Sequence, residues 1–230
     1  MRDSSNKRKW YAAGLLLLVV LSSSCNHQQA GHSGHSAPTA QHRFDDIDHW
    51  VKMFEDPARD EWQKPDEVVR AMNLRPGDVI ADIGAGTGYF TRRFAAAVGP
   101  DGKALGLDIE PSMVMYMYQD AEKLGFRNYE PRVVRTDDAE LSPRSVDVVF
   151  LCNTYHHLEN RISYFSKVAG ALKPGGRVIV VDFFKDTDFG PPREHKLGKE
   201  VVLEEMAQAG YRLMRDHDML TEQYFLEFGK

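Results

Sequence analysis

One stretch of this chain decides its fold: Val79-Ile80-Ala81-Asp82-Ile83-Gly84-Ala85-Gly86-Thr87-Gly88-Tyr89-Phe90. A short apolar run carries an acid near its end and then meets a glycine at every second position. An amphipathic helical pattern follows at once. Glycine tolerates positive φ, and because it has no Cβ it lets a ligand come close to the main chain. The stretch therefore predicts a strand that ends in a tight, ligand-binding turn before a helix.

The spacing of the glycines narrows the kind of ligand. A dinucleotide-binding turn needs Gly-x-Gly-x-x-Gly, whose last glycine would stand at position 89, and this chain has Tyr89 there. The chain instead has Asp-x-Gly-x-Gly-x-Gly, which resembles motif I of the class I S-adenosylmethionine-dependent methyltransferases. An ordinary strand-to-helix turn without a ligand is the alternative. Four further segments favour the resemblance.

The first of these segments is a second short apolar run, from Lys103 to Glu110, which reads as a buried strand. Its acid, Asp108, lies 24 residues beyond Gly84. That is near the ~20-residue offset at which a second strand presents a carboxylate to ribose hydroxyls. A carboxylate suits this task because it accepts both hydroxyl protons. Asp108 is therefore a predicted ribose ligand.

The other three segments follow in the order and at the spacing of the same family. Residues 133–141 resemble the segment in which an acid meets the adenine amino group, with Asp138 as the better match and Asp137 as the poorer one. Residues 146–153 form a buried-strand run. Residues 172–182 resemble a helix end, a Pro-Gly-Gly turn and the fifth strand. Together with the glycine turn, the resemblance covers residues 65–183.

The overall pattern is that of an α/β domain. Strand-like and helix-like segments alternate, which predicts a mostly parallel sheet. The apolar runs are continuous rather than alternating, as expected for strands that helices cover on both faces. Ligands of such sheets bind outside the carboxyl ends of the strands. Residues 211–217 and 223–228 read as two closing strands. The resemblance implies a Rossmann-like, doubly wound, seven-stranded sheet with helices on both faces and an antiparallel last strand.

The resemblance also implies S-adenosyl-L-methionine as the methyl donor and in-line displacement as the reaction. The residues that it assigns to donor binding are Asp82, Gly84, Gly86, Gly88, Asp108, Asp138 and Asn153. A general base is needed only if the methyl acceptor is protonated, and His156 and His157 are the candidates because histidine accepts a proton near neutral pH. A structural role is the favoured alternative for each of them singly. Tyr155 either lines the acceptor site or packs, and Asp182 either caps a turn or faces the acceptor.

Sequence details exclude some acceptors. Arsenite methyltransferases need several cysteines, and the predicted domain has only Cys152. Methyltransferases acting on adenine N6 or glutamine amides carry Asn/Asp-Pro-Pro-aromatic where this chain has Asn153-Thr154-Tyr155-His156. The chain is similar in style to the small-molecule branch, including the ubiquinone/menaquinone-biosynthesis methyltransferases, which favours a lipid-like or aromatic acceptor. A catalytically silent, exported binding or sensing module on the same fold is the alternative.

The N-terminus differs from the domain. Residues 1–25 combine a basic start, an apolar core from Tyr11 to Leu21 and small residues before Cys25. The core is too short to span a bilayer, which takes ~20 residues, and the pattern is that of a secretory signal. It resembles a bacterial lipoprotein signal with Cys25 as the lipidated residue; an uncleaved anchor is the alternative. Either form predicts membrane attachment. We expect the domain to be exported to the periplasmic face or cell envelope, with a cytoplasmic domain as the alternative.

The remaining boundaries follow from composition. Residues 26–42 form a polar Gly/Ser/His linker with too little apolar surface to fold. Its histidines could converge on zinc or copper, but a solvated linker is favoured and no metal site is predicted. The resemblance implies a methyltransferase domain over residues 43–230, in which 43–64 are a possible lid over the donor and 184–197 a possible opposite wall. A net charge of −5 gives no reason to expect a nucleic-acid partner, so the expected partner is a small-molecule acceptor.

Overall fold

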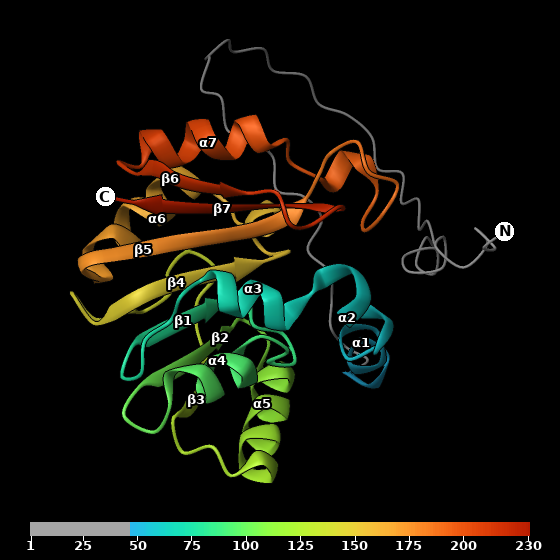
Figure 1. The fold of residues 1–230 in the computed structure, drawn as a ribbon, viewed down its shortest axis with the longest axis vertical. Helices are drawn as coiled ribbons and strands as arrows, with labels where there is room; N and C mark the ends of the chain where they lie inside the picture. The colour runs from blue at the N-terminus through green and yellow to red at the C-terminus, as the bar shows by residue number, and fades with distance from the viewer. Residues whose placement is uncertain (1–46) are drawn as a thin grey trace, which may run out of the picture.

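A computed structural model describes residues 47–230 of the chain. Its centre is a seven-stranded sheet in the order β3-β2-β1-β4-β5-β7-β6 (Figure 1). The strands are β1 (Val79–Ile83), β2 (Lys103–Asp108), β3 (Tyr129–Val133), β4 (Val146–Cys152), β5 (Leu172–Phe183), β6 (Arg212–His217) and β7 (Gln223–Gly229). The strands β1 to β5 pair in parallel, and β7 pairs antiparallel with both β5 and β6. The predicted fold class is confirmed, including the antiparallel last strand.

Alternation along each strand builds two apolar cores. Along β1, Ile80 packs into the core on one face, while Ala81 and Ile83 pack into the core on the other. The first face is covered by α3 (Pro65–Ala71), α4 (Thr91–Val98) and α5 (Pro111–Leu124). The second face is covered by α6 (Arg161–Ala171) and α7 (Lys199–Gln208). Because both faces are buried, the strands read as continuous apolar runs.

Local sequence signals fix the ends of several helices. Pro111 occupies the first turn of α5, where its missing N–H has no helical partner to lose. Gly125 ends the same helix in a left-handed conformation, with φ of 71°, which glycine adopts without steric strain. The helix therefore starts directly after β2 and stops in time for the chain to turn into β3.

Two short helices, α1 (Ile47–Phe54) and α2 (Ala58–Gln63), lie beside one end of the sheet (Figure 1). They belong to the segment 43–64 that the sequence predicts as a lid. The predicted signal, the lipidation site Cys25 and the histidine-rich linker lie outside the described residues. Within residues 47–230, no helix is both long and apolar enough to cross a membrane.

Candidate functional site

The three glycines of the turn after β1 all have positive φ, 69° at Gly84, 56° at Gly86 and 78° at Gly88. A Cβ at Gly84 would lie 2.3 Å from the side chain of Thr154. A Cβ at Gly88 would lie 1.7 Å from the hydroxyl oxygen of Tyr129. Packing inside the protein therefore already requires glycine at these two positions, whatever the turn binds.

Gly86 differs from its two neighbours. A Cβ at this position would meet only the ring of Phe54, at an ordinary contact distance of 3.4 Å. Its N–H donates to Oδ2 of Asp108 at 2.7 Å, and Oδ1 of Asp108 accepts the N–H of Glu110 at 3.0 Å. The carboxylate at the end of β2 thus holds the middle of the turn that follows β1. The turn and the predicted ribose ligand form one unit at the carboxyl ends of neighbouring strands.

The chemistry of this unit fits the ribose of an adenosyl group. Each oxygen of Asp108 accepts one backbone N–H, and a carboxylate oxygen has a second lone pair with which to accept a ligand hydroxyl. Burial raises the pKa of Asp108, while the backbone hydrogen bonds from Glu110 and Gly86 oppose that rise. Its carboxyl group is shielded from bulk water. A hydrogen bond to a ligand is stronger in such a buried place than in water.

Asp82 lies at the other side of the turn and is buried. Its Oδ2 accepts the hydroxyl of Thr91 at 2.6 Å, which ties β1 to the first residue of α4. Burial raises the pKa of Asp82 to about 7, the hydrogen bond from Thr91 lowers it, and the nearby charge of Asp108 raises it. Asp82 therefore stabilises the glycine turn from inside the protein, by joining the strand before it to the helix after it.

This raised pKa predicts a pH dependence of stability. The native protein holds a proton on Asp82 over a range, between 3.8 and about 7, in which the unfolded chain has lost it. The free energy of unfolding therefore falls as pH rises through this window, by at most about 4 kcal/mol from Asp82 alone. Asp82→Asn removes this contribution and can still accept the hydroxyl of Thr91. Urea unfolding at about pH 5 and pH 8 should give a smaller decrease for the variant than for the wild type. Equal decreases would contradict this account of Asp82.

The other two predicted donor ligands lie in the loops after β3 and β4. Asp138 is partly exposed; its Oδ1 accepts the N–H of Glu140 at 2.8 Å, and its Oδ2 lies 3.5 Å from Nζ of Lys167. Asn153 has φ of 56°, and its N–H donates to the carbonyl of Val181 at 2.9 Å. Both residues follow the carboxyl ends of strands, at the same edge of the sheet as the glycine turn, as the sequence predicts.

The two candidate bases have different surroundings. Nδ1 of His156 lies 2.8 and 3.0 Å from the two oxygens of Asp182, and both residues are buried. His157 is exposed, and its ring centroid lies 4.0 Å from that of His156. Asp182 also accepts the N–H of Phe183 at 2.8 Å. Asp182 thus anchors His156 and caps the end of β5.

Tyr155 does not lie at the surface of a binding site. It is fully buried, its ring stacks on Phe165 with centroids 5.2 Å apart, and its hydroxyl donates to Glu205 at 3.0 Å. Glu205 also forms a bidentate ion pair with Arg161. Of the two roles open for Tyr155, packing is the one that the structure supports.

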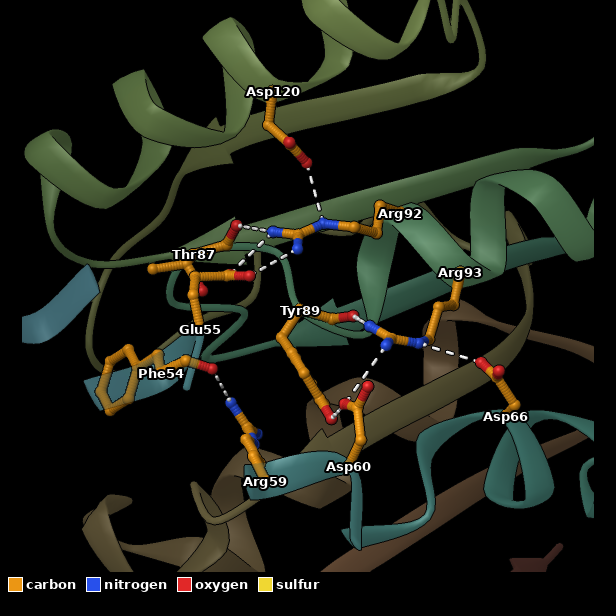
Figure 2. Close-up of polar contacts among 10 residues, drawn as sticks. All are labelled: Phe54, Glu55, Arg59, Asp60, Asp66, Thr87, Tyr89, Arg92, Arg93 and Asp120. Carbon is orange, nitrogen blue, oxygen red and sulfur yellow. Dashed lines mark hydrogen bonds and ion pairs between the residues drawn. The ribbon is translucent and has the colours of Figure 1, made fainter. Parts of the chain in front are cut away.

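An ion-pair network joins the lid segment to the glycine turn. The two terminal nitrogens of Arg92, on α4, contact Glu55 at 2.6 and 2.8 Å, and its Nε lies 2.9 Å from Asp120 on α5 (Figure 2). The same guanidinium donates to the carbonyl of Thr87, between Gly86 and Gly88, at 2.9 Å. Arg92 therefore connects the end of α1, the glycine turn and α5.

A second set of contacts surrounds Tyr89, the residue directly after the turn. Its hydroxyl donates to Asp60, and the guanidinium groups of Arg59 and Arg93 lie 3.8 and 4.3 Å from its ring centroid. Arg93 also pairs with Asp60 and with Asp66 (Figure 2). The lid segment thus packs directly on the start of α4.

The lid segment also meets the loop expected as the opposite wall. The ring centroid of Trp62 lies 4.9 Å from that of Phe189, in the loop, and 5.7 Å from that of Phe183, at the end of β5. The segment expected as a lid and the loop expected as the opposite wall are therefore in contact, through aromatic side chains.

Sequence reasoning missed a chain of buried amides. Nε2 of Gln63, on α2, donates to Oε1 of Gln223 on β7, and Nε2 of Gln223 donates to Oδ1 of Asn153. Gln63 and Gln223 are both fully buried. Burial of glutamine at these positions has no local sequence signature, because its partners lie 160 and 70 residues away.

Comparison with known proteins supplies the family. The model of a family described as "Methyltransferase domain" matches residues 74–219, which contain the glycine turn, Asp108 and all the strands up to β6. The chain belongs to this methyltransferase domain family. Its family and fold imply S-adenosyl-L-methionine as the methyl donor, as predicted.

Two curated relatives indicate the range of the family. A ubiquinone/menaquinone biosynthesis C-methyltransferase, UbiE, of Ectopseudomonas mendocina is 30% identical over 166 residues, covering 65% of this chain and 58% of the relative. An arsenite methyltransferase of Halobacterium salinarum is 28% identical over 116 residues, covering 50% of this chain and 30% of the relative. The chain thus spans less than two thirds of the length of either protein.

Solved structures agree with the fold. A crystal structure of a SAM-dependent methyltransferase from Aquifex aeolicus matches with a TM-score of 0.75 and 26% identity, over 80% of this methyltransferase-domain chain and 97% of that protein. The [4+2]-cyclase SpnF matches with a TM-score of 0.59 over 67% of this chain. At 19% identity, that likeness concerns the fold alone.

Proposed function

We propose that this protein transfers a methyl group from S-adenosylmethionine to a small-molecule acceptor that is aromatic or lipid-like. The observation that carries the proposal is the hydrogen bond from Gly86 N–H to Asp108, which makes the glycine turn and a buried carboxylate one unit. An acid and a glycine turn at adjacent strand ends form an adenosyl-binding arrangement. Family membership, over residues 74–219, supports the same activity.

The residues proposed to hold the donor divide its parts between strand ends. The methyl donor comes closest to the protein at the main chain of the glycine turn. Asp108 accepts hydrogen bonds from the ribose hydroxyls, and Asp138 accepts one from the adenine amino group. Asn153, after β4, lies on the opposite side of the turn from Asp138 in the strand order. S-adenosylmethionine supplies a methyl group that is already activated by its positive sulfur.

Catalysis by such a chain depends chiefly on positioning. Aligning two reactants and excluding water contributes as much as about 7–11 kcal/mol to lowering a bimolecular barrier. The ion pairs of Arg92 hold the lid segment against the turn, with the ring of Phe54 next to Gly86. We propose that this closed arrangement shields the donor from water during transfer.

A general base is needed only if the methyl acceptor is protonated, as a phenol or a carbon acid is. We propose that Asp182 fixes His156 as a structural residue, because both are buried and paired. His157 is then the candidate general base, since it is exposed in the turn after β4. Replacing His157 with Ala should slow transfer to phenols more than transfer to thiols, which ionise more easily.

The proposed acceptor class rests on the contact between Trp62 and Phe189, both partly exposed, and on the family relatives. Aromatic side chains offer a large apolar surface and stack on flat ligands. Relatives at about 30% identity are named for methylation in ubiquinone and menaquinone biosynthesis. Quinone-like and phenolic compounds are therefore the first acceptors to test.

The direct test incubates the full chain with methyl-labelled S-adenosylmethionine and a series of quinone-like and phenolic compounds. Label should move to at least one compound, and Asp108→Ala should abolish the transfer. Asp101→Ala, at an exposed acid in the turn before β2, is the matched control and should retain the activity. Donor binding without transfer to any compound of these classes would contradict the proposed acceptor.

We further propose that the N-terminus attaches the protein to a membrane through a lipid on Cys25, with the domain exported. The pattern of residues 1–25 supports this proposal. Mass spectrometry should find the mature chain starting at a lipidated Cys25, and Cys25→Ala should release the protein from membranes. A C-terminal reporter that is active only in the cytoplasm should be silent; activity with no lipid would contradict the proposal.

A further inference from the structure

Three arginines lie where the lid segment meets the glycine turn, and their partners differ (Figure 2). Arg92 pairs with Glu55 and Asp120, and Arg93 pairs with two carboxylates of α2 and α3. Within residues 47–230, Arg59 forms no ion pair. Its hydrogen bonds go to neutral oxygens, Oε1 of Gln63 at 2.8 Å and the carbonyl of Phe54 at 2.9 Å. Arg59 is thus a half-buried cation without a described anionic partner.

The guanidinium of Arg59 is nevertheless held in a fixed orientation. One of its faces lies 3.8 Å from the ring centroid of Tyr89. A guanidinium has five N–H donors in a rigid, planar fork. Gln63 and Phe54 take two of them and the Cys152 thiol contacts the group as well, so two remain for a ligand at its edge. This geometry matches a carboxylate, which a guanidinium binds through two parallel hydrogen bonds.

The charge of Arg59 acts at the ends of β1 and β4. Burial raises the pKa of the Cys152 thiol to about 12, and the positive charge of Arg59 opposes that rise. The same charge opposes the rise in the pKa of Asp82. Cys152 is the last residue of β4, and Asp82 precedes the turn after β1. Arg59 therefore lies on the β4 side of the turn.

The amide chain extends the same arrangement to Asn153. Oε1 of Gln63 accepts from Arg59, so its Nε2 group is directed to Gln223 and to Sγ of Cys152, at 3.2 Å from the sulfur. Gln223 in turn donates to Oδ1 of Asn153. Each amide in the chain is oriented by the one before it. The Nδ2 group of Asn153 is left as a donor without a partner in the described part of the chain.

On the basis of the proposed function, the strand order indicates which ligand these N–H groups bind. Adenine and ribose are assigned to Asp138 and Asp108, after β3 and β2. Since the sheet runs β3-β2-β1-β4, the rest of the donor must extend past β1 toward β4. That remaining part is the methionine moiety, whose one anionic group is its α-carboxylate. Arg59 and Asn153 lie at this end.

We propose that Arg59 binds the α-carboxylate of the donor's methionine moiety, that Gln63 positions Arg59 for this contact, and that Asn153 adds a second, neutral donor. The lid segment then has a chemical role besides covering the turn. It supplies the cation that recognises the amino-acid end of the donor. A ligand with the same adenosine but no carboxylate would lose this contact.

The test is calorimetric titration of the full chain with two ligands, S-adenosylhomocysteine and methylthioadenosine, which lacks the amino-acid group. Arg59→Gln should weaken binding of S-adenosylhomocysteine about tenfold to a hundredfold, as expected for a charged hydrogen-bonded contact. Its affinity for methylthioadenosine should change less than twofold. Gln63→Met should weaken S-adenosylhomocysteine alone, by a smaller factor. Arg70→Gln, an exposed residue of α3, is the control and should change neither.

Two results would overturn the inference while leaving the proposed function in place. Equal weakening of both ligands by Arg59→Gln would mean that Arg59 only holds the lid segment in position. Unchanged affinity for both would mean that another group binds the carboxylate. Failure of the wild-type chain to bind either ligand is a different result, because it would contradict the donor assignment itself, on which this inference rests.

Discussion

Asp108→Ala is expected to weaken binding of S-adenosylmethionine by at least about a hundredfold, since charged hydrogen bonds contribute about 1.5–3 kcal/mol each. The substitution removes the proposed acceptor of the two ribose hydroxyls. It also releases Gly86 N–H and Glu110 N–H, which the carboxylate now holds at 2.7 and 3.0 Å. Calorimetric titration of the full chain measures the loss.

The control for this prediction is an exposed acid at the opposite end of β2. Asp101 lies in the turn before that strand, so Asp101→Ala should bind the donor as the wild type does. Circular dichroism should establish that both variants are folded. Asp108→Ala binding with wild-type affinity, in a folded protein, would show that the ribose is held elsewhere.

The largest expected effect on stability belongs to Asp182→Ala. The substitution leaves the buried ring of His156 without its carboxylate and frees the N–H of Phe183. Removing one member of a buried charged or polar pair costs about 3–5 kcal/mol. For a domain of this size, that corresponds to a fall in Tm of roughly 6–20 °C. Thermal unfolding followed by circular dichroism measures the difference.

Asp186→Ala is the matched comparison, because Asp186 is exposed in the loop four residues further on. Exposed substitutions of this kind usually change stability by less than about 0.5 kcal/mol. If Asp182→Ala were as stable as Asp186→Ala, the buried pair with His156 would not support the fold. His156 would then return as a candidate base on the same terms as His157.

The fold was predictable because its signals are local. Continuous apolar runs mark the strands, and Phe90, Phe94 and Val98, which recur at helical spacing in the sequence, are all buried at or in α4. Leu124 and Ile162 also continue apolar rows at helical spacing in the sequence, but both are exposed. Each lies at one end of its helix, Leu124 at the end of α5 and Ile162 at the start of α6. Periodicity cannot recognise such ends, because it carries no information about how far the covering layer extends.

The site was predictable only in its local part. The spacing of the glycines and the position of Asp108 followed from sequence, and the structure joins them through one hydrogen bond. The roles of Arg59 and Gln63 did not follow, since both depend on contacts made by the lid segment with distant strands. Nothing in the sequence distinguishes Arg59 from Arg92 and Arg93, which pair with carboxylates among the described residues while Arg59 does not.

The central claim is that the glycine turn and Asp108 form a binding site for the methyl donor. Calorimetric titration of the full wild-type chain with S-adenosylmethionine and S-adenosylhomocysteine tests this claim most directly. We expect both ligands to bind with one site per chain and micromolar affinity. A folded chain that binds neither would contradict the account, and the methyltransferase fold would then serve another purpose in this protein.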